Sequence, residues 1–164
     1  MYAIGQTVLY GANGVCRISE ITTRKIGKEA IEYYVLKPMG MQASTVYVPT
    51  KNEELVGRMR AVGTAEEVRA LLAADSSLSW VDNNAERFEF FHAVLSRGEC
   101  GELMAMVRLM RARQRRLLAM GRHLHLTDER QLREAEKMAG EEVAAALGVT
   151  VQEALRLILG ETTG

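Results

Sequence analysis

The pattern of apolar and polar positions changes once along the chain. Residues 1–62 alternate apolar and polar positions in short runs, which is the period of β-strands. The runs cover residues 7–11, 15–21, 32–39, 44–48 and 55–62. From residue 63 onward, apolar residues recur every three or four positions, which is the period of amphipathic helices. The pattern therefore predicts two domains, residues 1–62 and residues 63–164.

Turn signals separate the predicted strands. Asn13-Gly14 is a strong hairpin signal because both residues tolerate a positive φ. Further turns are expected at residues 25–29 and 40–42, each containing a glycine. Pro49 follows the run at residues 44–48, which favours an edge strand because proline has no N–H to donate. Four or five short strands within about 60 residues predict a small, strongly bent SH3-like or Tudor-like β-barrel.

The second domain is predicted to be a bundle of about five α-helices. Thr64 with Glu67, and Thr150 with Glu153, have the spacing of capping boxes. Helices are expected at residues 64–74, 82–96, 100–120, 127–147 and 151–159. Thr127 and Asp128 are expected to cap the fourth helix. Glycines at positions 98, 121 and 148 should end the second, third and fourth helices. The fold class is therefore α+β, with an N-terminal barrel followed by a helical bundle.

Composition narrows the classes of function. The chain has 164 residues, no net charge and 48% hydrophobic residues, so packed cores are expected and the overall charge predicts no nucleic-acid partner. Two Cys and three His lack zinc-ligand spacing, and no phosphate-binding glycine loop occurs. We expect no metal, no cofactor and no enzymatic activity. The N-terminus lacks signal-peptide features and no apolar run approaches ~20 residues, so a cytoplasmic protein without membrane contact is expected.

Arginines form a stripe on the third predicted helix. At about 100° per residue, Arg108, Arg111, Arg115 and, if the helix reaches it, Arg122 fall within an arc of about 60°. No Asp or Glu occurs between Leu103 and Leu126. Arginines on one rigid face can contact successive phosphates of a nucleic acid. The alternative is an ordinary solvated face, but solvated helices commonly mix acids with bases. The position of Arg113 near the apolar face has no explanation in the sequence.

Trp80 is the only tryptophan and lies in a polar segment between two predicted helices. One interpretation is that it covers the helical core. The other is that it wedges against a base at the edge of a duplex, because inserted side chains stabilise distorted DNA. In that case Arg87, in the following helix, could contact a nearby phosphate.

Two further features have alternative interpretations. The strand containing Thr45, Val46, Tyr47 and Val48 could pair with a partner strand at the sheet edge. Alternatively, that edge is blunted by the proline and charged residues that follow. Cys100 lies at a helix N-terminus, where a thiol pKa is lowered, but Glu99 and Glu102 oppose a thiolate. A catalytic cysteine is therefore disfavoured.

The sequence resembles the CarD/CdnL family of bacterial transcription regulators over nearly all of its length. In residues 1–62 the resemblance depends on Ile4-Gly5-Gln6-Thr7-Val8-Leu9-Tyr10, Gly14-Val15, Tyr34-Val35-Leu36-Lys37 and Val46-Tyr47-Val48-Pro49. In the helices it depends on Trp80, on Leu126-Thr127-Asp128-Glu129-Arg130 and on Glu134-Ala135-Glu136.

The resemblance implies an N-terminal Tudor-like domain that binds the β subunit of RNA polymerase. It also implies a helical domain that contacts promoter DNA at the upstream edge of the bubble, in the minor groove and with weak sequence specificity. Trp80 matches the family's wedge, Arg87 matches an arginine of the basic group after it, and Arg24 matches a basic position facing polymerase. The sequence departs from the family at Tyr47, where some members have Arg, and at Glu89, where a basic residue is common.

The resulting hypothesis is a monomeric, nucleoid-associated transcription regulator. Its expected DNA-binding residues are Trp80, Arg87, Arg108, Arg111, Arg115 and Arg122, and its expected polymerase-binding residues are Arg24, Thr45, Val46, Tyr47 and Val48. The rival hypothesis is a polymerase adaptor that does not bind DNA and recruits a further protein through its methionine-rich surface. The sequence leaves open activation or repression, the promoters and the orientation of the two domains.

Overall fold

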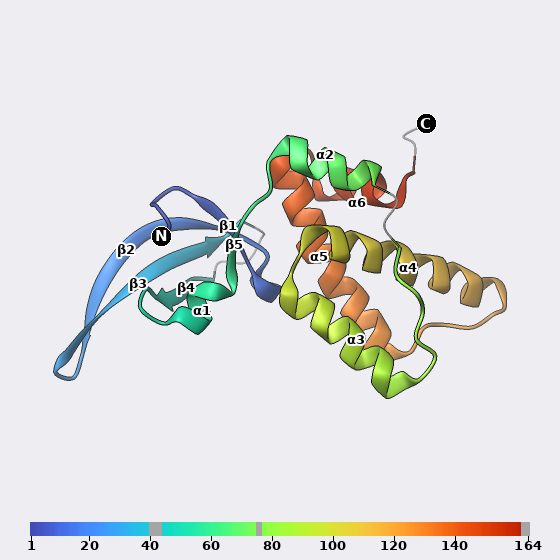
Figure 1. Ribbon diagram of the computed structural model, residues 1–164, viewed down its shortest axis with the longest axis horizontal. Coiled ribbons are helices and arrows are strands. Elements are labelled where there is room, and N and C mark those ends of the chain that lie inside the picture. The colour runs from blue at the N-terminus through green and yellow to red at the C-terminus, as the bar shows by residue number, and fades with distance from the viewer. Residues whose placement is uncertain (40–43, 75–76, 162–164) are drawn as a thin grey trace. The chain divides into compact units, whose positions relative to one another are not determined.

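The structure is a computed structural model that describes residues 1–39, 44–74 and 77–161. The chain divides into two compact units, Met1–Val62 and Gly63–Gly164. The first unit contains the strands and the second contains the long helices (Figure 1). Within the described residues, no helix has both the length and the apolar character needed to cross a bilayer.

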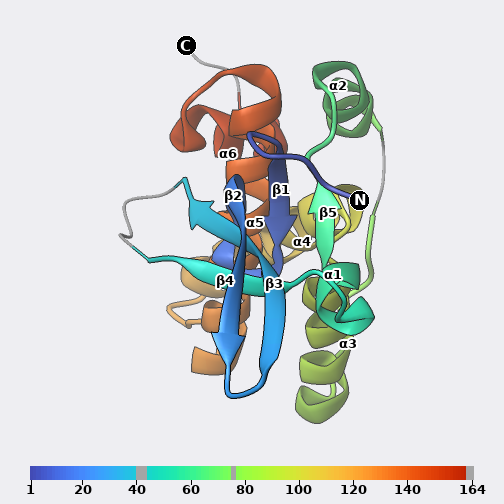
Figure 2. The same cartoon turned by 90° about the vertical axis from the view of Figure 1, so that its left-hand side faces the viewer.

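The N-terminal unit is a five-stranded antiparallel sheet, shown in Figure 2. Its strands are β1 (Thr7–Tyr10), β2 (Val15–Ile26), β3 (Glu29–Pro38), β4 (Val46–Pro49) and β5 (Met59–Ala61). They lie in the order β4-β3-β2-β1-β5, so β4 is an edge strand as Pro49 predicted. The 3₁₀ turn η1 (Gly11–Asn13) connects β1 to β2 at the Asn-Gly hairpin signal. The prediction of a Tudor-like domain with four or five short strands is confirmed.

The hairpin of β2 and β3 is longer than the alternation pattern predicted. The two strands pair from Cys16↔Pro38 out to Ile26↔Glu29, with a bulge between Ile18 and Glu20. The turn expected at residues 25–29 shrinks to two residues, because Gly27 adopts a φ of 66° at the first turn position. The hairpin therefore extends away from the core as an arm (Figure 1). The turn predicted at residues 40–42 lies outside the described residues.

The segment predicted as a strand at residues 55–62 is partly a helix. α1 (Glu53–Gly57) precedes the short strand β5. Asn52 caps this helix, since its side chain accepts a hydrogen bond from the backbone N–H of Leu55 at 3.1 Å. Glu53 and Glu54 follow in the first turn, where negative charge is favourable. The Asn52 cap therefore stabilises a short helix where the alternation of apolar and polar residues predicted a strand.

The core of this unit lies on one face of the sheet. It consists of seven buried side chains, Val8, Cys16, Ile18, Tyr34, Leu36, Val48 and Met59. Tyr2 packs against this cluster and donates from its hydroxyl to the carbonyl of Met59 at 3.1 Å. The cluster residues therefore recur at alternate positions of their strands, while Leu9, Val15 and Val35, at intervening positions, are buried as well.

The C-terminal unit contains five helices within the described residues: α2 (Ala65–Ala73), α3 (Asn84–Arg97), α4 (Cys100–Ala119), α5 (Leu126–Leu147) and α6 (Val151–Leu159). Thr64 and Thr150 cap α2 and α6 through their hydroxyl groups, as the capping boxes predicted. Gly98 and Gly148 end α3 and α5 in the left-handed conformation.

The start of α5 differs from the prediction. The helix begins at Leu126 after His125, so Thr127 and Asp128 lie within its first turn and do not cap it. Asp128 is buried at 3% exposure because it pairs with an arginine of α3. The Asp128 side chain was expected to cap the helix. In the structure it instead forms an ion pair with Arg87.

α5 is the central helix of the bundle and packs against α2, α3, α4 and α6 (Figure 1). Four buried methionines, Met104, Met106, Met110 and Met138, fill much of the interior, as expected for a chain with few aromatic residues. Gly140 allows α6 to approach closely, since a Cβ there would lie 3.1 Å from Cγ1 of Val151. The buried Glu142 accepts a hydrogen bond from the backbone N–H of Gly63 at 3.0 Å and so fixes the first residue of the unit.

Candidate functional site

The edge strand β4 has one hydrogen-bonded neighbour among the described residues. It pairs with β3 in the register Tyr34↔Val48 and Leu36↔Val46. The backbone N–H of Thr50 donates to the carbonyl of Glu32 at 3.0 Å, which places that pair in the hydrogen-bonded class. Hydrogen-bonded pairs recur at every second residue of an antiparallel ladder. The backbone groups of Val46 and Val48 therefore point toward β3.

The same alternation directs the other residues of β4 outward. Tyr47 presents its backbone N–H and C=O groups at the free edge, while Pro49 has no N–H to offer; Thr45 precedes the strand. Val48 is fully buried, so its side chain is unavailable to a partner, whereas Tyr47 is 41% exposed. Of the residues expected to bind polymerase, Val46, Tyr47 and Val48 lie in β4, and among these three only Tyr47 offers a pairing edge.

Arg24 lies beside Tyr47 although the two residues come from different strands. Its Nη2 donates to the Tyr47 hydroxyl at 2.9 Å, and its guanidinium carbon lies 4.5 Å from the ring centroid. Tyr33 meets the same ring edge to face at 6.0 Å. The structure thus joins two separately predicted polymerase-binding residues into one exposed, positively charged aromatic patch, which we call the Arg24–Tyr47 patch.

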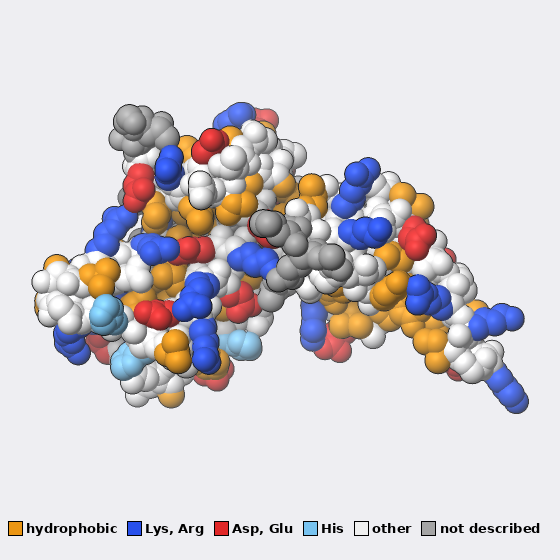
Figure 3. Space-filling view, turned by 180° about the vertical axis from the view of Figure 1, so that it is seen from behind, with side chains coloured by type: hydrophobic (Ala, Val, Ile, Leu, Met, Phe, Trp, Pro, Cys, Tyr) orange, Lys and Arg blue, Asp and Glu red, His pale blue; other side chains and the backbone are white. Residues whose placement is uncertain are grey.

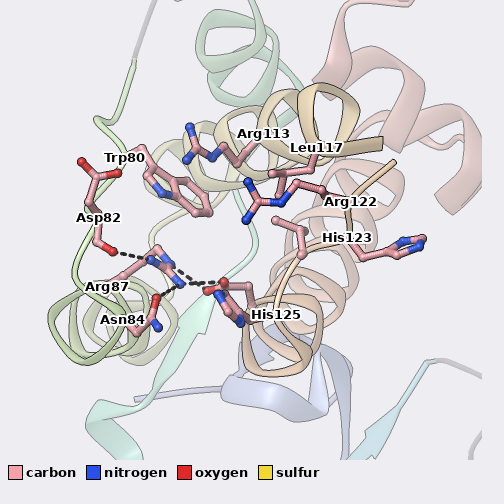
Figure 4. Close-up of a pocket in the computed structure, with 11 residues that line it drawn as sticks. Trp80, Asp82, Asn84, Arg87, Arg113, Leu117, Arg122, His123 and His125 are labelled. Carbon is pink, nitrogen blue, oxygen red and sulfur yellow. Dashed lines mark hydrogen bonds and ion pairs between the residues drawn. The ribbon is translucent and has the colours of Figure 1, made fainter. Parts of the chain in front are cut away.

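In the helical unit, a hollow of about 150 Å³ opens beside Trp80. Its walls come from the segment before α3, from α3 itself, from the C-terminal half of α4 and from the loop leading into α5 (Figure 4). The lining residues are Trp80, Asp82, Asn84, Arg87, Arg113, Leu117, Arg122, His123, Leu124, His125 and Asp128. We call this hollow the Trp80 pocket.

Trp80 is half-buried and not a free-standing aromatic. Its ring meets Phe91 of α3 in an edge contact at 6.0 Å. The guanidinium carbons of Arg87 and Arg113 lie 4.8 and 5.0 Å from the ring centroid, on opposite sides of the indole in Figure 4. Both alternatives raised for Trp80 therefore have a structural basis, since it covers the core while lining an open pocket.

Arg87 is placed differently from the phosphate contact that the sequence suggested. It is 3% exposed, and Nε and Nη2 donate to the two carboxylate oxygens of Asp128 at 3.0 and 2.9 Å. Its remaining N–H groups reach the carbonyls of Val81 and Asp82 and the side chain of Asn84. All five donors of this guanidinium are used, so Arg87 supports Trp80 from within the unit.

Arg113 differs from Arg87 because its charge has no acidic partner within the described residues. Its Nε is buried and has no hydrogen-bond partner there. Its position near the apolar face, unexplained by the sequence, is accounted for by the ring of Trp80. The sequence signal that could have identified Arg113 as a site residue was its position near the apolar face of the third predicted helix.

The arginines of the predicted stripe have separate roles. Arg108 donates to the carbonyls of Ile158 and Leu72, in the last turns of α6 and α2. Arg111 pairs with Glu136 at 2.6 Å and Arg115 with Glu161 at 2.8 Å. Figure 3 accordingly shows basic side chains of the helical unit interspersed with acidic ones. Although the third predicted helix lacks acids along most of its length, Arg111 and Arg115 find carboxylate partners on other segments of the chain.

Arg122 lies beyond α4, which ends at Ala119, so it does not belong to the helical stripe. It is exposed and lines the Trp80 pocket together with His123 and His125 (Figure 4). The two histidines and Asp128 had not been identified as site residues. The loop of residues 121–125 between α4 and α5 brings the basic groups together.

Other titratable groups do not form a second site of this kind. Cys100 is 5% exposed, which does not suit an accessible nucleophile. The described residues contain no cluster of His, Cys, Asp and Glu that could hold a metal ion. Glu102 accepts two hydrogen bonds from Arg97, and these bonds lower the pKa of its carboxyl group. This pair joins α3 to α4 on the surface.

The N-terminal unit is similar to a known family of domains. Residues 2–62 match the family described as CarD-like/TRCF RID domain, a group of RNA polymerase-interacting domains. The match covers all but the first residue of the sheet unit. It supports a transcription-related role with RNA polymerase as the partner.

Proposed function

We propose that this chain is a non-enzymatic transcription regulator of the CarD/CdnL type. Its sheet unit binds the β subunit of RNA polymerase, and its helical unit contacts promoter DNA at the upstream edge of the bubble. The observation that supports the first contact most directly is the family match of residues 2–62 together with the free edge of β4. An exposed strand edge can add a partner strand through backbone hydrogen bonds.

The Arg24–Tyr47 patch supplements that edge. A cation held on an aromatic ring next to free backbone groups favours a partner strand with an acidic side chain nearby. Arg24 stands next to Tyr47, at the position where some family members have Arg. The pair therefore supplies a basic group at this end of the edge strand without an arginine in β4 itself.

The proposed DNA contact is supported by the Trp80 pocket. Three arginines and two histidines line it, against two aspartates, of which Asp128 is already paired with Arg87. Contacts available only on melted or bent promoter DNA would favour the open complex by their differential free energy. The helical unit would then prolong the open complex while the sheet unit keeps it at the polymerase.

The first test is binding of the full chain to the β subunit of RNA polymerase. Tyr47→Pro removes one outward N–H and should weaken binding about tenfold or more, whereas Tyr47→Val keeps that N–H and should bind more tightly than the proline variant. Circular dichroism establishes that both variants fold. Arg24→Glu tests the cation without altering the strand, and equal affinity of all four proteins would refute the edge-strand contact.

The adaptor hypothesis makes a different prediction. The pairing of Arg108, Arg111 and Arg115 within the helical unit favours it, because these arginines already have partners. If the adaptor hypothesis holds, the full chain binds polymerase but adds no salt-dependent affinity for promoter DNA. A mobility-shift titration of polymerase–promoter complexes at two salt concentrations distinguishes the two functions.

A further inference from the structure

The two arginines on Trp80 differ in how well their donors are satisfied. Arg87 uses all five N–H groups within the helical unit. Arg113 touches the other side of the ring, yet its buried Nε has no partner among the described residues. A buried donor without a partner is unfavourable, so the site is incomplete without an acceptor. The acceptor that best matches a guanidinium is a planar or tetrahedral oxyanion.

The surroundings of Arg113 favour an anion. Arg122, His123 and His125 line the same pocket from the loop after α4. Both oxygens of Asp128 accept hydrogen bonds from Arg87, so this carboxylate does not neutralise Arg113. Figure 4 shows the other acid, Asp82, with its carboxylate directed away from Arg122 and His125. The pocket therefore keeps an excess of positive charge.

The size of the pocket restricts the ligand. Its volume is about 150 Å³. Sites for drug-sized molecules typically have volumes of about 300–1,000 Å³. The Trp80 pocket is therefore suited to one small oxyanion group, such as a single phosphate, and too small for a nucleotide base with its sugar.

We propose that Arg113, with Arg122, binds one phosphate of a nucleic-acid backbone, and that this phosphate draws the Arg113 guanidinium off the Trp80 ring. Only the choice of nucleic acid as the source of the phosphate rests on the function proposed above. Trp80 then keeps Arg87 and its edge contact with Phe91, and one face of the indole becomes free to meet a base. Arg113 is thus a movable cover for the indole, whereas Arg87 is a fixed support. Capture of the backbone and release of the tryptophan become a single event.

Trp80 provides the signal for the test, because it is the only tryptophan in the chain. The full chain is titrated with a short DNA duplex and, separately, with inorganic phosphate at constant ionic strength, while tryptophan emission is recorded. Arg113→Gln removes the proposed contact. Arg116→Gln is the matched control, since it removes the same charge from an exposed position of the same helix. Arg113→Lys retains the charge but loses the planar group.

The expected result is a saturable change in emission for the wild-type chain and for Arg116→Gln, a smaller change for Arg113→Lys and none for Arg113→Gln. The slope of log affinity for duplex against log salt should fall by about 0.9 in Arg113→Gln, the amount for one phosphate contact. Unchanged thermal unfolding shows that the variants are folded. An emission change and a salt slope in Arg113→Gln equal to those of the wild type would overturn the proposal.

Three further outcomes separate this site from the proposed function. If phosphate alters emission through Arg113 but duplex DNA does not, the ligand is a free phosphate and the nucleic-acid part of the proposal is overturned. If the duplex response requires Arg113 while Trp80→Ala leaves open-complex lifetime unchanged, the phosphate site stands and the regulatory function fails. If the open-complex lifetime depends on Trp80 but Arg113→Gln does not change DNA binding, only the phosphate site is refuted.

Discussion

The two units of this protein each place an arginine on an aromatic ring, but in opposite surroundings. In the sheet unit, Arg24 lies over Tyr47 at the surface, and Tyr47 is 41% exposed. In the helical unit, Arg87 lies against Trp80 with 3% exposure and a carboxylate partner. An exposed pair contributes little to stability because water screens it, whereas a buried charge must be fully paired. The same contact therefore stays accessible at the surface of one unit and belongs to the buried interior of the other.

Substitution of Arg87 should produce the largest effect on stability. Arg87→Ala leaves the buried Asp128 carboxylate unpaired, which typically costs about 3–5 kcal/mol. Urea unfolding followed by Trp80 emission measures this loss in the helical unit directly. Arg24→Ala, measured by circular dichroism, should change stability by less than about 0.5 kcal/mol, because it lies on the surface.

A paired substitution sharpens that result. Arg87→Met combined with Asp128→Leu removes both charges and should recover most of the stability lost in Arg87→Ala, since an apolar replacement of a buried ion pair is often neutral. If the double variant is as unstable as the single one, the hydrogen bonds to Val81, Asp82 and Asn84 matter more than the ion pair.

Trp80→Ala should act on transcription and leave polymerase binding unchanged. Loss of about 1 kcal/mol of DNA contact shortens the open-complex lifetime by about fivefold. The measurement is the decay of heparin-challenged open complexes in the presence of each variant. Trp80→Phe keeps an aromatic ring and should give an intermediate lifetime, and an unchanged lifetime for Trp80→Ala would remove the wedge role.

Two exposed arginines should differ in their effect on DNA affinity. Arg115 is paired with Glu161, whereas Arg122 has no ion pair within the described part of the chain. Arg122→Gln should therefore weaken binding to a DNA duplex about two- to fivefold more than Arg115→Gln at low salt, and this difference should shrink as salt increases. Equal losses from both substitutions would indicate that the general positive field matters more than the pocket.

The smallest effect is expected at the surface pair of Arg97 and Glu102. Hydrogen bonds from Arg97 lower the pKa of Glu102, so this carboxylate contributes stability above its unfolded pKa, about 4.3, and loses it as the pH falls through the lower folded value. Thermal unfolding between about pH 6 and about pH 3 should show a slightly weaker pH dependence in Glu102→Gln. Glu89→Gln, on an exposed position of α3, is the control.

The features predicted best from the sequence are local ones. Thr64 and Thr150 cap α2 and α6 because a hydroxyl followed three residues later by a glutamate satisfies the first N–H groups without help from distant residues. Pro49 identified the edge strand for a similar reason, since its missing N–H excludes a central position. The helix at Glu53–Gly57 was missed because the alternating pattern was weighted above the Asn52 cap.

The partners of the charged residues could not be predicted. Nothing near Arg111 or Arg115 in the sequence indicates Glu136 or Glu161, and nothing near Arg87 indicates Asp128, 41 residues away. The arginines predicted to form one basic face therefore have different surroundings. Arg108 contacts two helix ends, Arg111 and Arg115 form ion pairs, and Arg122 lies in a loop. Arg113 and the two histidines of the Trp80 pocket come together only when α4 and the following loop close over Trp80.

The sequence by itself determined the strand-rich and helix-rich parts, the helix boundaries to within about two residues and the resemblance to a polymerase-binding family, because periodicity, caps and turn residues act over a few positions. The tertiary structure alone decided which charges are free. A guanidinium is neutralised by whichever carboxylate packing brings within about 4 Å, and that distance depends on helices far apart in the chain. Arg87 and Arg113 illustrate this, since both contact Trp80. All five N–H groups of Arg87 have acceptors, whereas the buried Nε of Arg113 has none among the described residues.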